Sequence, residues 1–129
     1  MFQVFVVDDE EIIRTGIRNA LEKAEGQFRF AGEAPDGEMA LPVLLEVKPD
    51  ILITDVRMPF MDGLELSRLV KKALPRTRII VLSGYNEFEY AKEAIKIGIS
   101  DYLLKPVSSA GLIDALKKAA DEIREEREK

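Results

Sequence analysis

The hydrophobic positions of the chain follow two different spacings. Short runs of almost purely apolar, mostly β-branched residues recur along the sequence, and the stretches between them carry an apolar residue every three or four positions. The first spacing is typical of buried strands and the second of helices that pack on a sheet. The predicted strands are residues 3–7, 28–33, 51–54, 78–82 and 101–104. The predicted helices run from Ile13 to near Gly26, over 36–47, 63–73 and 87–97, and from Ser108 or Ser109 onward.

The alternation of these segments predicts the fold class. Strands that are apolar on both faces and are joined by helices form parallel sheets covered on both sides. We therefore predict an α/β fold, a doubly wound five-stranded parallel sheet in the order 2-1-3-4-5. A chain of 129 residues suits a single domain of this kind.

Two segments depart from the regular pattern. Pro42 lies inside the second predicted helix and should bend or weaken it, unless that helix starts later than residue 36. Pro35 directly precedes this helix, so the residue at which the helix starts stays open. No apolar residue follows Ile123. We therefore place the domain at 1–123 and treat 124–129 as a charged helical extension. Two interpretations stay open for it, a solvated, fraying terminus or the start of a linker to a further output domain.

The composition of the chain excludes several classes of catalytic and binding site. The chain has no Cys and no His, which excludes disulfides, thiolate zinc sites, thiol catalysis and a histidine general base. Its net charge of −5 argues against nucleic-acid binding by this domain alone. No apolar run approaches the roughly 20 residues that span a bilayer, and the first residues lack the basic region of a signal peptide. The remaining chemistry must use carboxylates, hydroxyls and amines.

Polar residues follow the predicted strands at their carboxyl ends. They are Asp8, Asp9 and Glu10 after the first strand, Asp55 after the third, Ser83 after the fourth and Lys105 after the fifth. Ligands of open α/β sheets bind at this edge, where the strand order reverses. Each residue also has a simpler interpretation, as a helix-capping acid, a turn former or an exposed lysine. We assign Asp62 mainly to the turn.

The residue types in this group restrict what it can do. Adjacent carboxylates repel one another unless a cation lies between them, and oxygen-only ligands favour Mg²⁺. A lysine suits a phosphate group, and a carboxylate can act as a nucleophile that forms an acyl phosphate. The residues therefore predict a Mg²⁺-assisted phosphoryl transfer to an aspartate.

Four motifs occur in a fixed order. They are VVDDE, ILITDVRMPFMDG, VLSGY and DYLLKPV. Together they make the chain resemble, over 1–123, the receiver domain of bacterial two-component response regulators, with its flavodoxin-like fold. The sequence of these motifs is most similar to that of receivers joined to AraC-type DNA-binding domains. The resemblance implies a cytoplasmic phosphorelay switch that takes its phosphoryl group from a sensor histidine kinase. Such a switch is not a conventional enzyme, and in the full-length protein it would control transcription.

The resemblance also implies roles for the site residues. Asp55 would be the phosphoacceptor. Mg²⁺ would be held by Asp9, Asp55 and the backbone carbonyl of Arg57, with Asp8 acting mostly through water. Lys105 would pair with the phosphoryl group, and its bond to Pro106 would be cis.

Switching residues follow from the same resemblance. Ser83 would donate its hydroxyl to the phosphoryl group, and Tyr102 would be the aromatic switch that moves with it. The surface formed by the fourth helix, the fifth strand and the fifth helix would carry output and homodimerisation. Arg57 and Tyr85, two positions after Asp55 and Ser83, would slow hydrolysis of the phosphoryl group.

One residue of these motifs, Phe60, departs from the receiver pattern, and three alternative functions for the chain remain. Phe60 stands where the loop often carries glycine. Two roles stay open for it, contact with a partner kinase and restriction of entry to the loop.

A pseudo-receiver would signal without phosphate, although all five key positions are present. A haloacid dehalogenase-like phosphohydrolase would carry its nucleophile after the first strand. A flavin carrier would lack acids there, because they repel the FMN phosphate.

Overall fold

The computed structural model describes residues 1–24, 26–84 and 88–128. Its strands are β1 (Phe2–Val7), β2 (Phe28–Ala34), β3 (Ile51–Asp55), β4 (Arg78–Ser83) and β5 (Asp101–Leu104). Its helices are α1 (Glu11–Glu22), α2 (Gly37–Val47), α3 (Gly63–Ala73), α4 (Phe88–Ile97) and α5 (Ser109–Glu128). Each predicted strand and helix is present, and α1 ends before Gly26, which follows in a turn with a φ of 81°.

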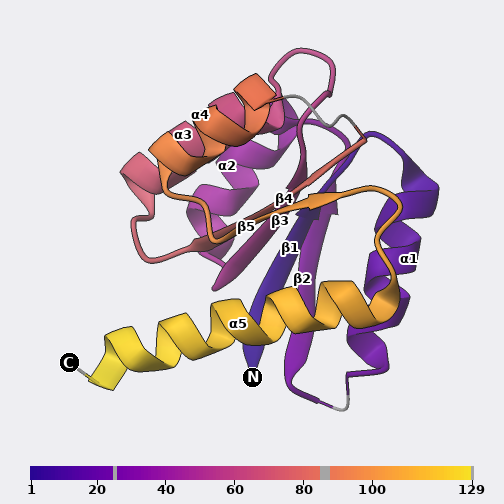
Figure 1. Cartoon of the computed structure of the whole chain (residues 1–129), viewed down its shortest axis with the longest axis vertical. Coiled ribbons are helices and arrows are strands. Elements are labelled where there is room, and N and C mark those ends of the chain that lie inside the picture. Colours follow the sequence, from indigo (N-terminus) through magenta and orange to yellow (C-terminus); the bar gives the residue numbers. More distant parts are fainter. Residues whose placement is uncertain (25, 85–87, 129) are drawn as a thin grey trace.

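The strands form one parallel sheet in the order β2-β1-β3-β4-β5, as predicted (Figure 1). The register pairs Val7 with Thr54, Asp55 with Leu82, and Ser83 with Leu104. The carboxyl ends of four neighbouring strands therefore meet at one edge of the sheet, the edge at which polar residues follow the strands.

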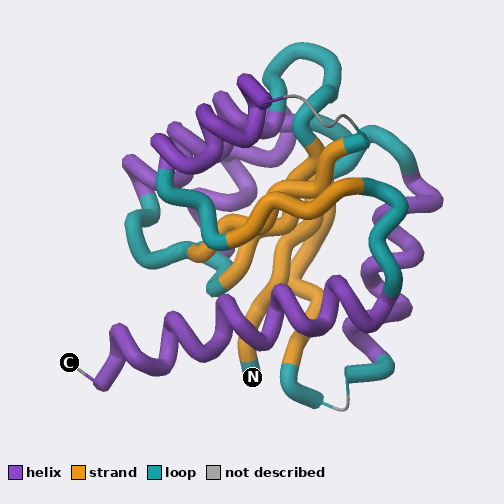
Figure 2. Tube along the Cα trace, viewed as in Figure 1, coloured by secondary structure: helices purple, strands orange, loops and turns teal. Residues whose placement is uncertain are grey.

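Helices cover both faces of the sheet, with α1 and α5 on one side and α2, α3 and α4 on the other (Figure 2). Alternate residues of β1 explain the two cores. Val4 and Val6 pack in the cluster that includes residues of α1 and α5, whereas Phe5 and Val7 pack in the cluster of α2, α3 and α4. Both sets are fully buried, which is why the strand sequences are apolar without alternation.

The helix α2 begins at Gly37 and continues through Pro42 to Val47. The later start that Pro42 suggested is therefore wrong. The Asp36 carboxylate caps the helix, accepting a hydrogen bond of 2.8 Å from the backbone N–H of Met39. Pro42 removes one backbone donor inside the helix, and the fully buried Leu44 shows that packing on the sheet holds the segment helical beyond it.

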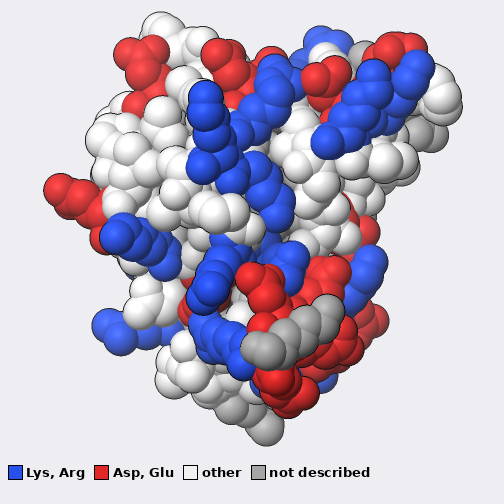
Figure 3. Space-filling view, turned by 90° about the vertical axis from the view of Figure 1, so that its left-hand side faces the viewer, with Lys and Arg blue, Asp and Glu red and all other residues white. Residues whose placement is uncertain are grey.

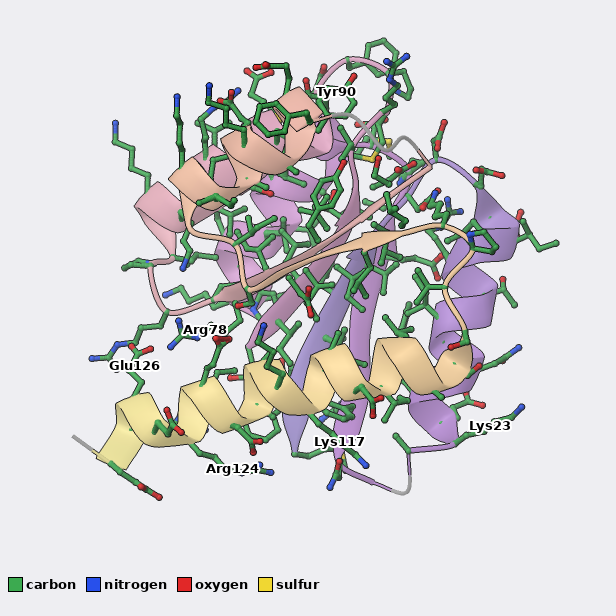
Figure 4. All side chains as sticks on the ribbon, viewed as in Figure 1. Lys23, Arg78, Tyr90, Lys117, Arg124 and Glu126 are labelled. Atoms are coloured by element: carbon green, nitrogen blue, oxygen red, sulfur yellow. The ribbon has the colours of Figure 1, made fainter. Side chains whose placement is uncertain are left out.

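The last turns of α5 contact the amino-terminal edge of the sheet. The Arg78 guanidinium pairs with Glu126, and Arg127 pairs with Asp50 at 3.0 Å. The Arg127 guanidinium also lies 5.8 Å from the centre of the Phe2 ring. Figure 4 shows Arg78 and Glu126 pointing toward one another, and Figure 3 shows acidic and basic side chains interleaved around this end of α5. The charged extension therefore lies against the domain.

Candidate functional site

The carboxyl ends of β1, β3 and β5 bring one ammonium group and three carboxylates together. The Lys105 ammonium lies 2.9 Å from Asp8 Oδ2 and 3.3 Å from Asp55 Oδ2, and it is 3.9 Å from Glu10 Oε1. These residues are far apart in the chain, and the sheet order places them side by side. The predicted convergence of carboxylates and an amine at this edge is confirmed.

Asp8 is buried and is fixed through both its side chain and its backbone. Its Oδ1 accepts a hydrogen bond of 2.9 Å from the backbone N–H of Glu10. Arg14 donates from Nη1 to the Asp8 carbonyl oxygen and from Nε to Glu33 Oε1, both at 2.6 Å. Sequence reasoning did not find Arg14 or Glu33, because no spacing in the chain signals a contact between α1 and the end of β2.

The environment of Asp55 makes its carboxylate less acidic than usual. Burial first, and then the charge of Asp8, raise the pKa of Asp55 to about 6, although Lys105 and a hydrogen bond from the backbone N–H of Val56 oppose the shift. Burial lowers the pKa of Lys105, but its hydrogen bond and attraction to Asp8, with a smaller contribution from Asp55, raise it overall. At neutral pH both Lys105 and Asp55 are therefore mainly charged.

An acidic cluster lies in front of this lysine. Asp8, Asp9 and Glu10 each offer a carboxylate oxygen, and these oxygens lie within 4.8 Å of one another. Asp9 and Glu10 are exposed, so solvent reaches the cluster. Oxygen donors at this spacing suit a hard divalent cation that keeps part of its water shell.

The loop after β3 leads directly into α3, and Phe60, Asp62 and Gly63 determine its conformation. A Cβ atom at Gly63 would lie 1.7 Å from the carbonyl oxygen of Asp55, so only glycine lets α3 start this close to the site. Asp62 caps α3 by accepting from the backbone N–H of Glu65 at 2.8 Å, so its structural role is that of a helix cap, whereas the sequence analysis assigned it to the turn. Phe60 is exposed and has a φ of 71°, the left-handed conformation that glycine adopts without strain.

The residues predicted to switch lie at the carboxyl end of β4 and in β5. Ser83 is fully buried, and its carbonyl oxygen accepts a hydrogen bond of 2.8 Å from the backbone N–H of Lys105. Tyr102 is half-buried against the core cluster of α2, α3 and α4. The Lys105–Pro106 peptide is cis, as expected. Tyr85 lies outside the described residues.

Arg57 and Tyr90 connect the loop after β3 to the first turn of α4. Arg57 Nε donates to the Tyr90 hydroxyl at 2.9 Å, and the guanidinium lies 5.6 Å from the ring centre. Figure 4 shows Tyr90 at the start of α4, beside that loop. A pocket of about 510 Å³ lies next to the pair, lined by Asp9, Val56, Arg57, Met58, Pro59, Asp62 and Tyr90. Tyr90 gave no signal in the sequence, because it lies within a helix and its contact with Arg57 depends on how that helix packs beside the loop.

Residues 4–117 match the model of the response regulator receiver domain family. The chain belongs to this family. This receiver domain is 41% identical over 124 residues to YesN of Bacillus subtilis (strain 168), an uncharacterized transcriptional regulatory protein, covering 96% of the chain and 34% of YesN. It is 40% identical over 112 residues to the transcriptional regulatory protein HptR of Staphylococcus aureus (strain N315), covering 87% of the chain and 44% of HptR. The receiver thus spans less than half the length of either relative.

Solved structures agree with this assignment. The REC domain of AraT, a response regulator from Geobacillus stearothermophilus, matches with a TM-score of 0.89 and 40% identity over 98% of each chain. The isolated REC domain of RcsB from Salmonella enterica serovar Typhimurium, in the presence of the phosphomimetic BeF3⁻, matches with a TM-score of 0.83 and 30% identity, over 90% of this chain and 86% of that one. Within the described residues, no helix has the length and apolarity to cross a membrane.

Proposed function

We propose that this receiver domain is a phosphorelay switch in which Asp55 accepts a phosphoryl group from a sensor histidine kinase. One observation carries the proposal: the Lys105 ammonium lies within hydrogen-bonding distance of Asp8 and within 3.3 Å of Asp55, at the edge where the strands end. A mainly ionised carboxylate beside a fixed cation combines a nucleophile with a partner for phosphoryl oxygens.

The transfer step uses groups that the chain already holds in place. A carboxylate oxygen of Asp55 attacks the phosphorus of the kinase phosphohistidine, and a P–O bond forms as the P–N bond breaks. The electron pair of that bond goes to the imidazole nitrogen, which takes a proton from solvent. Lys105 and the Ser83 hydroxyl stabilise the negative charge of the phosphoryl oxygens. Because the Asp55 pKa is about 6, the nucleophile is mainly ionised at neutral pH.

The acidic residues fit Mg²⁺ by their chemistry. The donors are all oxygen, the carboxylates of Asp8, Asp9 and Glu10 lie within 4.8 Å of one another, and the chain has no His or Cys to favour a softer metal. Asp55 is not part of that cluster, but Lys105 lies beside both Asp8 and Asp55. Asp9, Asp55 and the Arg57 carbonyl would hold the ion directly, and Asp8 mainly through water. Bound Mg²⁺ would offset the charge that gathers on the transferred group.

Switching would act through the surface formed by α4, β5 and α5. Phosphorylation adds about −1.5 to −2 charges near Ser83 and Lys105, which biases an existing equilibrium between two conformations. Tyr102 would move with Ser83. The large apolar side chains of Phe88, Ile95 and Leu104 are 75%, 79% and 45% exposed on this surface, which supports its use as a homodimer interface.

We place the output outside this domain. The relatives are named transcriptional regulators and are more than twice as long as the segment that matches. Residues 124–129 would begin the linker to an output domain of AraC type that controls transcription in the cytoplasm. With a net charge of −5, the receiver itself is not the DNA-binding part.

The phosphoryl group should be long-lived. Arg57 and Tyr85 are large residues that stand two positions after Asp55 and Ser83 in the sequence, and in receivers such positions influence how water reaches the acyl phosphate. Arg57→Ala and Tyr85→Ala should therefore each lose the phosphoryl group faster than the wild type.

Intact mass after incubation with Mg²⁺ and acetyl phosphate tests the proposal. The wild type should gain one phosphoryl group, and Asp55→Asn should gain none. Asp62→Asn is the matched control, because asparagine also caps a helix and its phosphoryl uptake should be normal. A wild type that gains no mass and forms no beryllofluoride adduct would leave a receiver fold that signals without phosphate.

A further inference from the structure

We propose that Arg14, held in place by Glu33, is a positioning residue that fixes the peptide between Asp8 and Asp9 and thereby places the Asp9 carboxylate for Mg²⁺. The inference rests on the proposed function, since it concerns the ion that would assist the transfer to Asp55. It adds an ion pair between α1 and β2 to the contacts on which the acidic site depends.

The direction of the Asp9 carboxylate depends on the backbone that carries it. The Asp8 carboxylate is fixed by Lys105 at 2.9 Å and by the backbone N–H of Glu10. The Asp9 side chain is exposed, and in the described part of the chain no hydrogen bond or ion pair holds it. Its place in the acidic cluster is therefore set by the turn between β1 and α1.

The Arg14 side chain fixes this turn at the carbonyl of Asp8. Arg14 Nη1 donates to the Asp8 carbonyl oxygen at 2.6 Å, and among the described residues no backbone N–H donates to the same oxygen. The carbonyl belongs to the planar peptide that joins Asp8 to Asp9, so this bond fixes the plane from which the Asp9 side chain leaves. Because the donor is charged, the bond is stronger than one between neutral groups.

Glu33 holds the guanidinium in the orientation that this bond needs. Arg14 Nε donates to Glu33 Oε1 at 2.6 Å, and the Arg14 side chain is only 15% exposed. Two bonds from one planar group leave that group a single orientation. Glu33 lies near the end of β2, and Figure 1 shows α1 beside this strand. The arginine therefore ties the turn after β1 to the neighbouring strand of the sheet.

The charges around Arg14 separate positioning from electrostatics. Lys105 lies among carboxylates, where its ammonium competes with a cation for Asp8. Arg14 instead binds a carbonyl oxygen, and Glu33 balances its charge, so it supports the turn without occupying the place of the ion. A positive charge near the cluster repels Mg²⁺, so loss of the Arg14 charge alone would strengthen Mg²⁺ binding. Loss of its positioning contact would weaken that binding.

Binding of Mg²⁺ to Arg14 variants distinguishes these two effects. A titration with MgCl₂ at constant ionic strength, followed through the backbone amide NMR signals of Asp9 and Glu10, gives the Kd without any phosphoryl transfer. We expect Arg14→Met, which keeps the apolar stem, to bind Mg²⁺ about tenfold more weakly, as is typical when a group that orients a metal ligand is lost. Arg14→Lys keeps the charge but not the planar fork, so it should also bind more weakly than the wild type.

Arg18→Met is the matched control. Arg18 lies one turn further along α1 and also faces Glu33, at 3.9 Å, but within the described residues it makes no hydrogen bond or ion pair with Asp8. Its loss should leave the Mg²⁺ affinity unchanged. Glu33→Ala should weaken Mg²⁺ binding in the wild type and have no further effect in Arg14→Met, because Glu33 acts through Arg14.

The possible results separate the inference from the proposed function. The amide spectrum shows whether each variant is folded. Folded Arg14 variants that bind Mg²⁺ as tightly as the wild type, or more tightly, would overturn the inference while the proposed function stands. An equal loss of affinity in Arg18→Met would overturn it too, because the loss would not depend on the contact with Asp8. A wild type whose amide signals do not respond to Mg²⁺ would overturn both the inference and the proposed metal site.

Discussion

At the scale of single residues, Lys105 offsets the repulsion between two buried carboxylates. Its ammonium lies 2.9 Å from Asp8 and 3.3 Å from Asp55, whose side chains are 1% and 9% exposed. The lysine does not remove the cost completely, because the pKa of Asp55 stays raised at about 6. The three groups therefore keep an unfavourable charge balance, which a further cation near Asp55 would relieve.

The raised pKa of Asp55 predicts a pH-dependent gain in stability for Asp55→Asn. The folded protein holds the Asp55 proton more tightly than the unfolded chain, so this stabilisation is complete below the usual pKa of 3.8 and is lost as the pH rises to about 6. Without Mg²⁺, we expect the free energy of unfolding of Asp55→Asn to exceed that of the wild type by about 3 kcal/mol at neutral pH, since one pKa unit corresponds to about 1.4 kcal/mol.

Urea unfolding across this pH range measures the difference. The gain should shrink toward zero as the pH falls below the usual carboxyl pKa. Asp114→Asn, the same change at an exposed position of α5, should show no such dependence. An Asp55→Asn variant that is less stable than the wild type at neutral pH would contradict the charge balance described above.

The sequence predicted part of the site, and the reason lies in the fold. Asp8, Asp55, Ser83 and Lys105 could be found because each follows a predicted strand, and parallel strands end at one edge. Tyr90 could not be found this way, because its contact depends on how a helix packs beside a loop. The same holds for Arg14.

Phe60 predicts a further change in stability at the residue scale. Its φ of 71° costs an L-residue about 1–2 kcal/mol, and an 83% exposed side chain repays little of this by packing. Phe60→Gly should therefore raise the free energy of unfolding by about 0.5–1 kcal/mol, after the greater freedom of glycine in the unfolded chain is counted. Chemical denaturation is the measurement. Phe60→Ala keeps the backbone strain, and an equal gain in that variant would refute the explanation.

At the scale of elements, hydrophobic spacing predicted every strand and helix because each element buries a face. The start of α2 was also predicted correctly, near Asp36, although Pro42 left a later beginning open. The cap formed by Asp36 and the burial of Leu44 outweigh the proline. Such packing depends on the whole sheet, so it could not be weighed against Pro42 from the local sequence.

Pro42 predicts that α2 can be stabilised by one substitution. The proline lacks the N–H that would donate to the Glu38 carbonyl in a regular helix, and proline inside a helix costs about 3 kcal/mol relative to alanine. Part of this is returned because proline restricts the unfolded chain. We expect Pro42→Ala to raise the free energy of unfolding by about 1–2 kcal/mol in urea titrations. Pro75→Ala, in the turn after α3, should give no gain. Equal effects of the two changes would contradict the prediction.

At the scale of the whole molecule, the acidic site and the end of α5 lie at opposite edges of the sheet. Figure 1 shows α5 starting near the loop that follows β5 and ending on the side where both termini lie. Arg78 and Asp50 hold its last turns there through Glu126 and Arg127. Any segment attached after α5 would therefore leave from the edge far from Asp55, with α5 as the element that joins the two.

Binding of Mg²⁺ to the acidic site should stabilise the whole domain. A ligand that binds only the folded state adds about 1.4 kcal/mol for each tenfold rise in concentration above its Kd. Thermal or urea unfolding in MgCl₂ at constant ionic strength should show this rise in the wild type. Asp9→Asn should abolish it, whereas Asp114→Asn should retain it. Unfolding that is independent of millimolar Mg²⁺ in the wild type would contradict the metal assignment.

The central claim is that Asp55 carries the phosphoryl group, and chemical trapping tests it most directly. Borohydride reduces an aspartyl phosphate to homoserine, and peptide mass spectrometry then locates the altered residue. After incubation with Mg²⁺ and acetyl phosphate, we predict homoserine at position 55, and none in a sample without acetyl phosphate. Homoserine at Asp8, Asp9 or Asp62 in place of Asp55, or at no aspartate in a protein that has gained phosphoryl mass, would contradict the account.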